Sequence, residues 1–359
     1  MSAKPSDSSR HVALTAEELA AVAGRMVAAG IDLGGPLRCH LIAGGRSNLT
    51  YRLDEGEAGS KDGRAWVLRM PPRLGRTPSA HDVAREYRVT SALSAAGVPV
   101  ARPVVLCEDD SVIGLPFAVA EFVRGHAVQS RADLDALAPP VLEATTARLI
   151  ETLAEVHMVD HVAVGLERFG RPDGNAERQV RRWSGQWEIV GDPALGSLAT
   201  DLARRLAAAD FDQRSTGVVH GDYRIDNTLL SFGADGPRVE AVVDWELSTI
   251  GDPVADVALM CVYRHPALDL VLGFPGAWTS NRLPGPDALA AAYEAAGGVP
   301  LVDWNKHLAL GYFKLAVIAA GIDHRYRAGA TQGDGFDTAA QAVQPLLEAG
   351  SVALRQGPS

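Results

Sequence analysis

The sequence contains little cysteine and little lysine. Its 359 residues include three cysteines, Cys39, Cys107 and Cys261, which are too scattered for a CxxC metal site and too few for a disulfide framework. We therefore expect three reduced thiols in the protein core. Only four lysines accompany thirty arginines, a bias that GC-rich codon usage explains and to which we attach no functional role.

The sequence also lacks an apolar segment long enough to cross a membrane and lacks an excess of positive charge. No run of about 18 apolar residues occurs, and residues 1–14 have neither the cationic nor the apolar region of a signal peptide. Subtracting 44 acidic from 34 basic residues gives a net charge of −10, which opposes binding to nucleic acid. We expect a cytoplasmic protein that binds neither membrane nor nucleic acid, and no pattern indicates a protein partner.

The N-terminal part of the chain has the pattern of a small, strand-rich domain. Thr15 and Glu18 form a capping box for a helix that Gly30 ends, and Ser79 is placed to cap a second helix that ends at Gly97. The short apolar and β-branched runs between and after them are typical of strands. The predicted strands are two within 38–53, joined by Gly44-Gly45, and single strands at 65–70, 104–109 and 116–122.

From residue 141 the apolar residues recur at helical spacing, beginning with a helix over 141–157. Two β-branched runs, 217–231 and 238–245, interrupt this pattern and predict a buried hairpin, and long helical patterns follow at 286–297, 301–328 and 334–354. The expected fold class is α+β, with two lobes and an active site in the cleft between them. The predicted domains are a tail and helix over 1–34, a β-rich N-lobe over 35–123 and a larger helical C-lobe over 124–359.

Polar side chains gather at the ends of the two β-branched runs. Asp222 and Asn227 follow the first apolar stretch, and Asp244 ends the second. These three groups could supply one base and two oxygen ligands for magnesium at a polyphosphate. Alternatively, Asp222 and Asn227 could only satisfy backbone donors in a turn, and the HGD triplet alone does not decide between the two interpretations. Nearby, Asp252 and Asp256 are expected to cap and brace a helix.

The motifs around these residues resemble those of the aminoglycoside phosphotransferase and choline kinase family, which has a protein-kinase-like fold. The sequence HGDYRIDN at 220–227 matches the family's HGDxxxxN catalytic loop, and VVDWE at 242–246 matches its metal-binding aspartate motif. Four further elements occur in the family's order, and the resemblance covers 35 to about 330. They are the glycine-rich turn IAGGRSNLTY, Arg69 in WVLRM, Glu86 in AREYRV, and the connecting strand Glu121-Phe122-Val123.

The resemblance implies ATP and Mg²⁺ as cofactors and a role for each motif residue. Asp222 would accept the proton of the substrate hydroxyl, while Asn227 and Asp244 would hold magnesium. Arg69 would bridge phosphate and Glu86. The remaining implied nucleotide-binding groups are the backbone at Gly44 and Gly45, the side chains of Ser47 or Asn48, the carbonyl of Glu121 and the amide of Val123.

Two features set this chain apart from protein kinases. Arg69 stands where protein kinases carry lysine, but guanidinium is always charged and can still clamp a phosphate. Only seven residues lead from Asp244 to Gly251, which leaves no room for a phosphorylated activation loop. Both features favour a small-molecule hydroxyl acceptor over a protein substrate.

A cationic, aromatic segment is the candidate acceptor wall. Arg178 and Arg182 stand at i and i+4 beside Trp183 and Trp187, which suits a phosphate or carboxylate joined to an apolar body. Arg325 adds a cation near the end of a later helix. A solvated charged helix face explains the same pattern equally well.

The cationic wall indicates the charge of the acceptor, and the branch that the chain resembles bears on its chemical type. WVLRMPP and RQVRRWSGQW are similar to segments of the family branch that is also found fused to acyl-CoA dehydrogenases. We therefore expect an ATP- and magnesium-dependent kinase of a neutral or anionic alcohol, and the branch favours an acyl-type acceptor. The alternatives are an aminoglycoside-modifying resistance kinase and a nucleotide-binding pseudokinase module.

Overall fold

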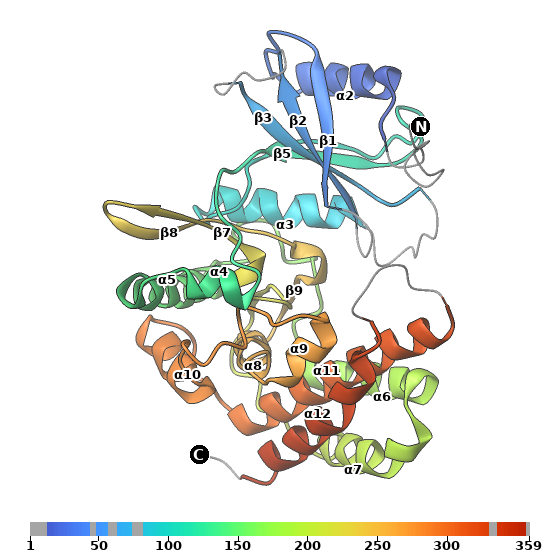
Figure 1. Ribbon diagram of the computed structural model, residues 1–359, viewed down its shortest axis with the longest axis vertical. Coiled ribbons are helices and arrows are strands. Elements are labelled where there is room, and N and C mark those ends of the chain that lie inside the picture. The colour runs from blue at the N-terminus through green and yellow to red at the C-terminus, as the bar shows by residue number, and fades with distance from the viewer. Residues whose placement is uncertain (1–12, 44–47, 57–62, 74–81, 330–335, 357–359) are drawn as a thin grey trace, which may run out of the picture. The chain divides into compact units, whose positions relative to one another are not determined.

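The computed structural model describes residues 13–43, 48–56, 63–73, 82–329 and 336–356. It divides into two compact units, Met1–Arg124 and Gly125–Ser359 (Figure 1). Across the described residues, no helix combines the length and apolar character needed to span a membrane. The α+β class and the strand-rich and helical parts predicted from the sequence are confirmed.

The first unit is built on a five-stranded antiparallel sheet of order β1-β2-β3-β5-β4. Alternate residues of the central strands are buried, Tyr51 and Leu53 on β2 and Leu68 and Met70 on β3, as expected for one apolar face of a pleated sheet. The strands are β1 Leu37–Ala43, β2 Leu49–Glu55, β3 Ala65–Met70, β4 Pro103–Cys107 and β5 Phe117–Glu121. These agree with the five predicted strands.

Two helices accompany this sheet. The helix α2, Ala16–Ala28, begins with the predicted capping box of Thr15 and Glu18 and packs against β1 and β4. The helix α3, Val83–Ala95, packs against β4 and β5 and is capped by Asp82, whose carboxylate accepts from the amide of Arg85 at 2.9 Å. The prediction that Ser79 caps this helix was wrong, because Asp82 supplies the cap nearer to the first helical turn; Ser79 itself lies outside the described residues.

The second unit is mainly helical. Its longest helix, α11, packs against α6, α8 and α12, and α5 buries Leu142, Leu149 and Leu153 at the predicted helical spacing. The helices are α4 Arg131–Asp135, α5 Pro139–His157, α6 Asn175–Val190, α7 Gly196–Ala207, α8 Pro253–Val262, α9 Ala267–Leu272, α10 Pro286–Ala295, α11 Trp304–Arg327 and α12 Ala339–Ala353. The three long C-terminal patterns are therefore helices as predicted.

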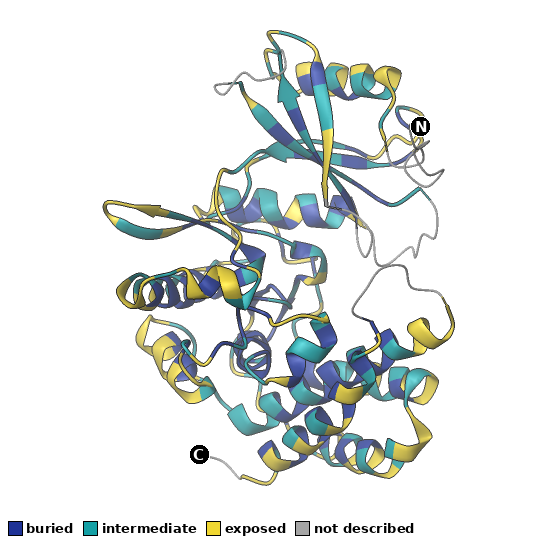
Figure 2. Ribbon diagram, in the orientation of Figure 1, coloured by how far each residue is buried: buried dark blue, intermediate teal, exposed yellow. Residues whose placement is uncertain are grey.

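The predicted hairpin of the second unit is only partly correct. The strands β7, Thr228–Gly233, and β8, Gly236–Val242, form a hairpin, but β6, Gly217–Val219, pairs instead with β9, Thr249–Gly251. The segment between β6 and β7 leaves the extended conformation, which splits the first β-branched run. The hairpin tip is also exposed rather than buried (Figure 2).

Candidate active site

The loop after β6 presents Asp222 on a tightly constrained backbone. Gly221 has a left-handed conformation, with φ 84°, and a Cβ there would come within 2.9 Å of the Leu247 carbonyl oxygen. Glycine is therefore required immediately before Asp222. The carboxylate of Asp256 on α8 accepts from the amides of His220, at 2.6 Å, and Gly221, at 2.8 Å, which fixes the backbone leading into Asp222.

Asp256 itself is buried in a polar network. Burial raises the pKa of the Asp256 carboxyl, but the hydrogen bond with His157 and the neighbouring His220 and Gly221 outweigh burial and lower that pKa. His157 contacts Asp256 at 3.2 Å through Nε2 and the hydroxyl of Tyr293 at 2.7 Å through Nδ1. Asp252 caps α8 by accepting from the amide of Val254, as predicted. Asp256, which was also expected to brace a helix, instead braces the loop before Asp222.

Asn227 lies directly against Asp222. Its Nδ2 donates to Asp222 Oδ2 at 3.0 Å and to the Asp222 carbonyl oxygen at 2.8 Å. The guanidinium of Arg224 lies 3.4 Å from Asp222 Oδ2 and 2.9 Å from Asp226 Oδ2. The amide nitrogen of Asn227 is thereby committed to Asp222, so its oxygen is the end that remains suited to a cation.

Asp244 is joined to the same loop through the backbone. The amide of Val243 donates to the Asn227 carbonyl at 2.9 Å, and His220 Nε2 donates to the Val243 carbonyl at 2.9 Å. His220 Nδ1 accepts from the amide of Asp222 at 3.2 Å, so its ring is the neutral tautomer protonated at Nε2. Asp244 then adopts a left-handed backbone, with φ 66°. The two sequence motifs are therefore one connected structure.

The charges of Asp222 and Asp244 act on the neighbouring carboxyl of Asp226. Burial is the largest cause of a raised pKa at Asp226; Arg224 lowers that pKa, while the charges of Asp222 and Asp244 raise it further. In the described part of the chain, no group of three or more histidine, cysteine or acidic residues is arranged to hold a metal. Asn227 and Asp244 instead offer one amide oxygen and one carboxylate, which is the partial donor set that magnesium completes with water and phosphate.

In the first unit, two predicted nucleotide-binding residues form an ion pair. Arg69 on β3 and Glu86 in the first turn of α3 lie 3.0 Å apart between Nη1 and Oε1. Their side chains are only 21% and 11% exposed, so solvent screens this pair less than a surface pair. The structure therefore brings together the cation and the carboxylate that the sequence predicted as partners.

The other predicted residues of the first unit have less defined surroundings. Gly44, Gly45 and Ser47 lie outside the described residues. Asn48 is 4% exposed, and its Oδ1 has no hydrogen-bond partner among the described residues. The Glu121 carboxylate pairs with Arg102, and half-buried Val123 follows the end of β5.

The predicted acceptor residues on α6 divide into two groups. Arg178 donates to the backbone carbonyls of Arg171 and Asp173, and Trp187 is buried against Gly191. Both side chains are therefore occupied in local structure. Arg182 is exposed, and its guanidinium lies 5.2 Å from the centre of the Trp183 ring.

Sequence reasoning missed Lys314 in this neighbourhood. This lysine of α11 donates to the Gly221 carbonyl at 3.2 Å and lies 5.9 Å from the centre of the Trp183 ring. The available signal was a single cation within the mainly apolar segment GYFKLAVIAAG. Arg325 lies on the same helix, and its Nη1 is 3.6 Å from the position of a Cβ added to Gly321.

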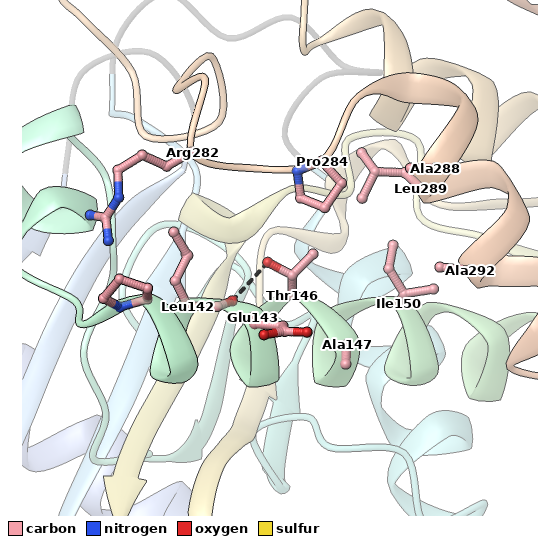
Figure 3. A pocket seen from close by; sticks show the side chains of 11 residues that line it. Leu142, Glu143, Thr146, Ala147, Ile150, Arg282, Pro284, Ala288, Leu289 and Ala292 are labelled. Atoms are coloured by element: carbon pink, nitrogen blue, oxygen red, sulfur yellow. Dashed lines mark hydrogen bonds between the residues drawn. The ribbon is translucent and has the colours of Figure 1, made fainter.

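A separate pocket of about 610 Å³ lies on α5 and α10 (Figure 3). Leu142, Thr146 and Ile150 of α5 line one side of it, and Pro284 and Leu289 lie on the other; the Thr146 hydroxyl donates to the Leu142 carbonyl at 2.8 Å. None of the predicted site residues lines this pocket, so it is distinct from the site around Asp222.

Comparison with known proteins places the chain in a family. The sequence pattern that defines the phosphotransferase enzyme family matches residues 38–309. A curated relative, acyl-CoA dehydrogenase family member 11 from Gallus gallus, is 37% identical over 328 residues, which are 88% of this chain and 40% of that protein. The chain thus spans well under half of the length of this relative.

Solved structures agree with this assignment. A proposed aminoglycoside phosphotransferase from Ralstonia eutropha is 31% identical, with a TM-score of 0.79 over 95% of this chain and 98% of that one. Choline kinase from Cryptosporidium parvum, at 13% identity, has a TM-score of 0.58 over 89% of this chain and 91% of its own. The second likeness concerns the fold alone.

Proposed function

The chain belongs to the phosphotransferase enzyme family, and we propose that it transfers the γ-phosphoryl group of ATP to a hydroxyl group of a small molecule in a magnesium-dependent reaction. The observation that carries this proposal is the connected loop in which Asp222, Asn227 and the segment before Asp244 are tied by hydrogen bonds. Phosphoryl transfer depends mainly on positioning and on stabilising negative charge, and such a rigid arrangement of oxygen donors suits both tasks.

Asp222 is proposed as the group that accepts the proton of the acceptor hydroxyl. Its Oδ2 is oriented by Asn227 and Arg224, and the backbone before it is held by Asp256. A base must be held within hydrogen-bond reach of its substrate, so this support has a catalytic purpose. As the proton moves to Asp222, the acceptor oxygen forms its bond to the γ-phosphorus, and the bond from that phosphorus to the oxygen bridging to the β-phosphate breaks, so that ADP leaves.

Asn227 and Asp244 are proposed to hold magnesium. Their donor types fit a hard cation. Asn227 directs its amide nitrogen toward Asp222, which leaves its amide oxygen for the cation. Asp244 contributes a carboxylate. Magnesium, when bound, would neutralise negative charge on the phosphate oxygens. Burial and the charges of Asp222 and Asp244 raise the pKa of Asp226. The positive charge of magnesium would stabilise the ionised form of this carboxyl as well.

The first unit is proposed to bind the nucleotide. Glu86 orients Arg69 through their ion pair, and the guanidinium of Arg69 is proposed to clamp phosphate with its planar fork of donors. Asn48, with a buried and unsatisfied Oδ1, and the turn at Gly44, Gly45 and Ser47 are proposed to approach the phosphates. The carbonyl of Glu121 and the amide of Val123 are proposed to pair with adenine.

The acceptor is proposed to be a neutral or anionic alcohol of acyl type. Arg182 and Trp183 supply a cation and an aromatic surface on α6, whereas Arg178 and Trp187 are occupied locally. Arg325 is retained as a further cation. Support for an acyl-type acceptor comes from the similarity to a protein named as an acyl-CoA dehydrogenase family member.

Two alternative functions are an aminoglycoside-modifying kinase and a pseudokinase module. An aminoglycoside-modifying kinase is supported by the similarity to the Ralstonia eutropha protein and to viomycin phosphotransferase from Streptomyces vinaceus, which is 39% identical over 22% of this chain. A pseudokinase module would bind nucleotide without turnover, and the intact set of Asp222, Asn227 and Asp244 argues against it.

A screen of hydroxylated metabolites for acceptor-stimulated ADP release, with ATP and Mg²⁺, tests the proposal. We expect stimulation by one class of neutral or anionic alcohol and its loss when Mg²⁺ is chelated. Efficient turnover of kanamycin-like compounds alone would favour the resistance kinase. Nucleotide binding without stimulated ADP release by any acceptor would favour the module.

A further inference from the structure

We propose that Lys314, Arg182 and Trp183 form an anion-binding subsite beside Asp222, and that the acceptor is an alcohol bearing a carboxylate or phosphate group on an apolar body. This inference rests on the proposed function and names the chemical class of its acceptor. Lys314 would contact the anionic group, and Trp183 would contact the apolar body.

The position of Lys314 is the main observation. Its Nζ lies 3.2 Å from the carbonyl oxygen of Gly221, the residue before Asp222. An ammonium group has three donors in different directions, and this hydrogen bond uses one of them. Lys314 therefore contacts the residue before the proposed base, and its ammonium can donate further hydrogen bonds to a ligand.

The charge of Lys314 is incompletely compensated. Among the described residues, no carboxylate lies within 4.0 Å of its ammonium to form an ion pair. Burial is the largest cause of a lowered pKa at Lys314; the charges of Asp222 and Asp256 raise that pKa and the charge of Arg182 lowers it. Asp256 already accepts from two amides and contacts His157. A partly buried cation in such surroundings gains from an anionic ligand, because buried charge is costly unless it is paired.

Two cations lie near the ring of Trp183. Arg182 Cζ lies 5.2 Å and Lys314 Nζ lies 5.9 Å from its ring centre, and its Nε1 donates to Gln179 at 2.9 Å. That hydrogen bond fixes the ring, which can present a flat apolar surface to a ligand. Arg182 and Lys314 repel one another, and one anion between them would offset this repulsion.

The packing of α6 on α11 extends this cationic face. Trp183 is near Lys314, and seven residues further along each helix Val190 is near Gly321, so the two helices run side by side in the same direction. Arg325 follows at the end of α11, eleven residues and about 16 Å beyond Lys314 at the helical rise. A short acceptor would therefore use Lys314 and Arg182, and only a long one would reach Arg325.

The test compares acceptors that share a carbon skeleton and differ in charge. The pairs are hydroxybutyrate with the corresponding butanediol, and glycerol phosphate with glycerol, so that carboxylate and phosphate are distinguished. We expect the wild type to prefer the anion in at least one pair. Lys314→Met should raise KM for that anion by roughly 10- to 100-fold, the loss expected for a hydrogen bond to a charged group, with less than about 3-fold change for the neutral partner.

A structural role for Lys314 makes a different prediction. If its only task were to hold the Gly221 carbonyl, Lys314→Met would lower kcat for neutral and anionic acceptors alike. Lys314→Arg should restore much of the affinity for the anion, since it retains the charge. Lys306→Gln on the same helix and Arg181→Gln on α6 remove a charge elsewhere and should leave the preference unchanged.

Binding measurements keep this inference separate from the proposed function. If no alcohol stimulates ADP release, the proposed function fails, and calorimetric titration of the same anions into wild type and Lys314→Met still tests the subsite. Anion binding that Lys314→Met weakens supports the subsite without turnover. Equal binding to both proteins, no anion binding at all, or a preference for neutral or cationic acceptors would overturn it.

Discussion

The carboxylate of Asp256 accepts a hydrogen bond from the amide of Gly221 at 2.8 Å, which ties the first turns of α8 to the residue before Asp222. The same carboxylate accepts from His220, so a single side chain satisfies two successive buried amides. The backbone of the loop is therefore positioned by a residue that lies 34 positions beyond Asp222 in the sequence.

Asp256→Ala should destabilise the protein and reduce its activity. Removing this acceptor leaves two buried amides unsatisfied and takes away the partner of His157 Nε2, at a cost of about 3 kcal/mol. Urea unfolding measures the loss, and Asp287→Ala, an exposed acid in the first turn of α10, is the matched control with an expected change of about 0.5 kcal/mol. Equal stability of Asp256→Ala and the control would mean that the amides find other partners.

Arg69→Ala should raise KM for ATP and lower kcat. It removes the proposed phosphate clamp and leaves the buried Glu86 carboxylate without the partner that it contacts at 3.0 Å. Arg69→Lys should recover only part of the activity, because a compact ammonium does not reproduce the guanidinium fork. Steady-state kinetics of Arg69→Ala that match the wild type would assign the clamp to another cation.

The buried pair of Asp252 and His307 should contribute little to the dependence of stability on pH, because the two proton uptakes cancel. Burial raises the pKa of Asp252 to about 6 and lowers the pKa of His307 to about 4, and the two groups lie 3.4 Å apart. Between pH 6 and pH 4, the folded protein carries a proton on Asp252 and none on His307. In the same range the unfolded chain carries a proton on His307 and none on Asp252. These effects offset one another, so the pair contributes little slope in this range.

Asp252→Asn should reveal the contribution of His307 to the pH dependence of stability. Asparagine keeps the helix cap but does not take up a proton, so only the unfolded chain is protonated as pH falls from about 6.5 to 4. The variant should lose about 2 kcal/mol of stability over that range relative to the wild type. Parallel stability profiles of the two proteins, from urea unfolding at several pH values, would contradict this assignment.

Local patterns were sufficient to predict much of the fold. The alternation of buried residues on β2 and β3 and the capping box at Thr15 depend on neighbours in sequence, and such signals can be read from a single chain. The proximity of Asp222 and Asn227 was also readable, since five residues and a turn connect them.

Features that depend on distant segments could not be predicted in this way. The pairing of β6 with β9 joins two three-residue strands, each too short to reveal its partner. Lys314 appeared as one lysine in an apolar helix, and only its contacts with Gly221 and Trp183 reveal a role. Conversely, Arg178 looked available on its helix but is used by backbone carbonyls just before that helix.

The separate roles of Asp222 and Asp244 are the central claim, and nucleotide binding and turnover of their alanine variants test it most directly. Asp222→Ala should lower kcat by about 10²- to 10⁴-fold with Mg²⁺–ATP affinity near that of the wild type, because the base acts on the acceptor. Asp244→Ala should weaken Mg²⁺-dependent ATP binding as well as turnover. Identical nucleotide affinities for the two variants, or more than about half of the activity retained by Asp222→Ala, would contradict the assignment.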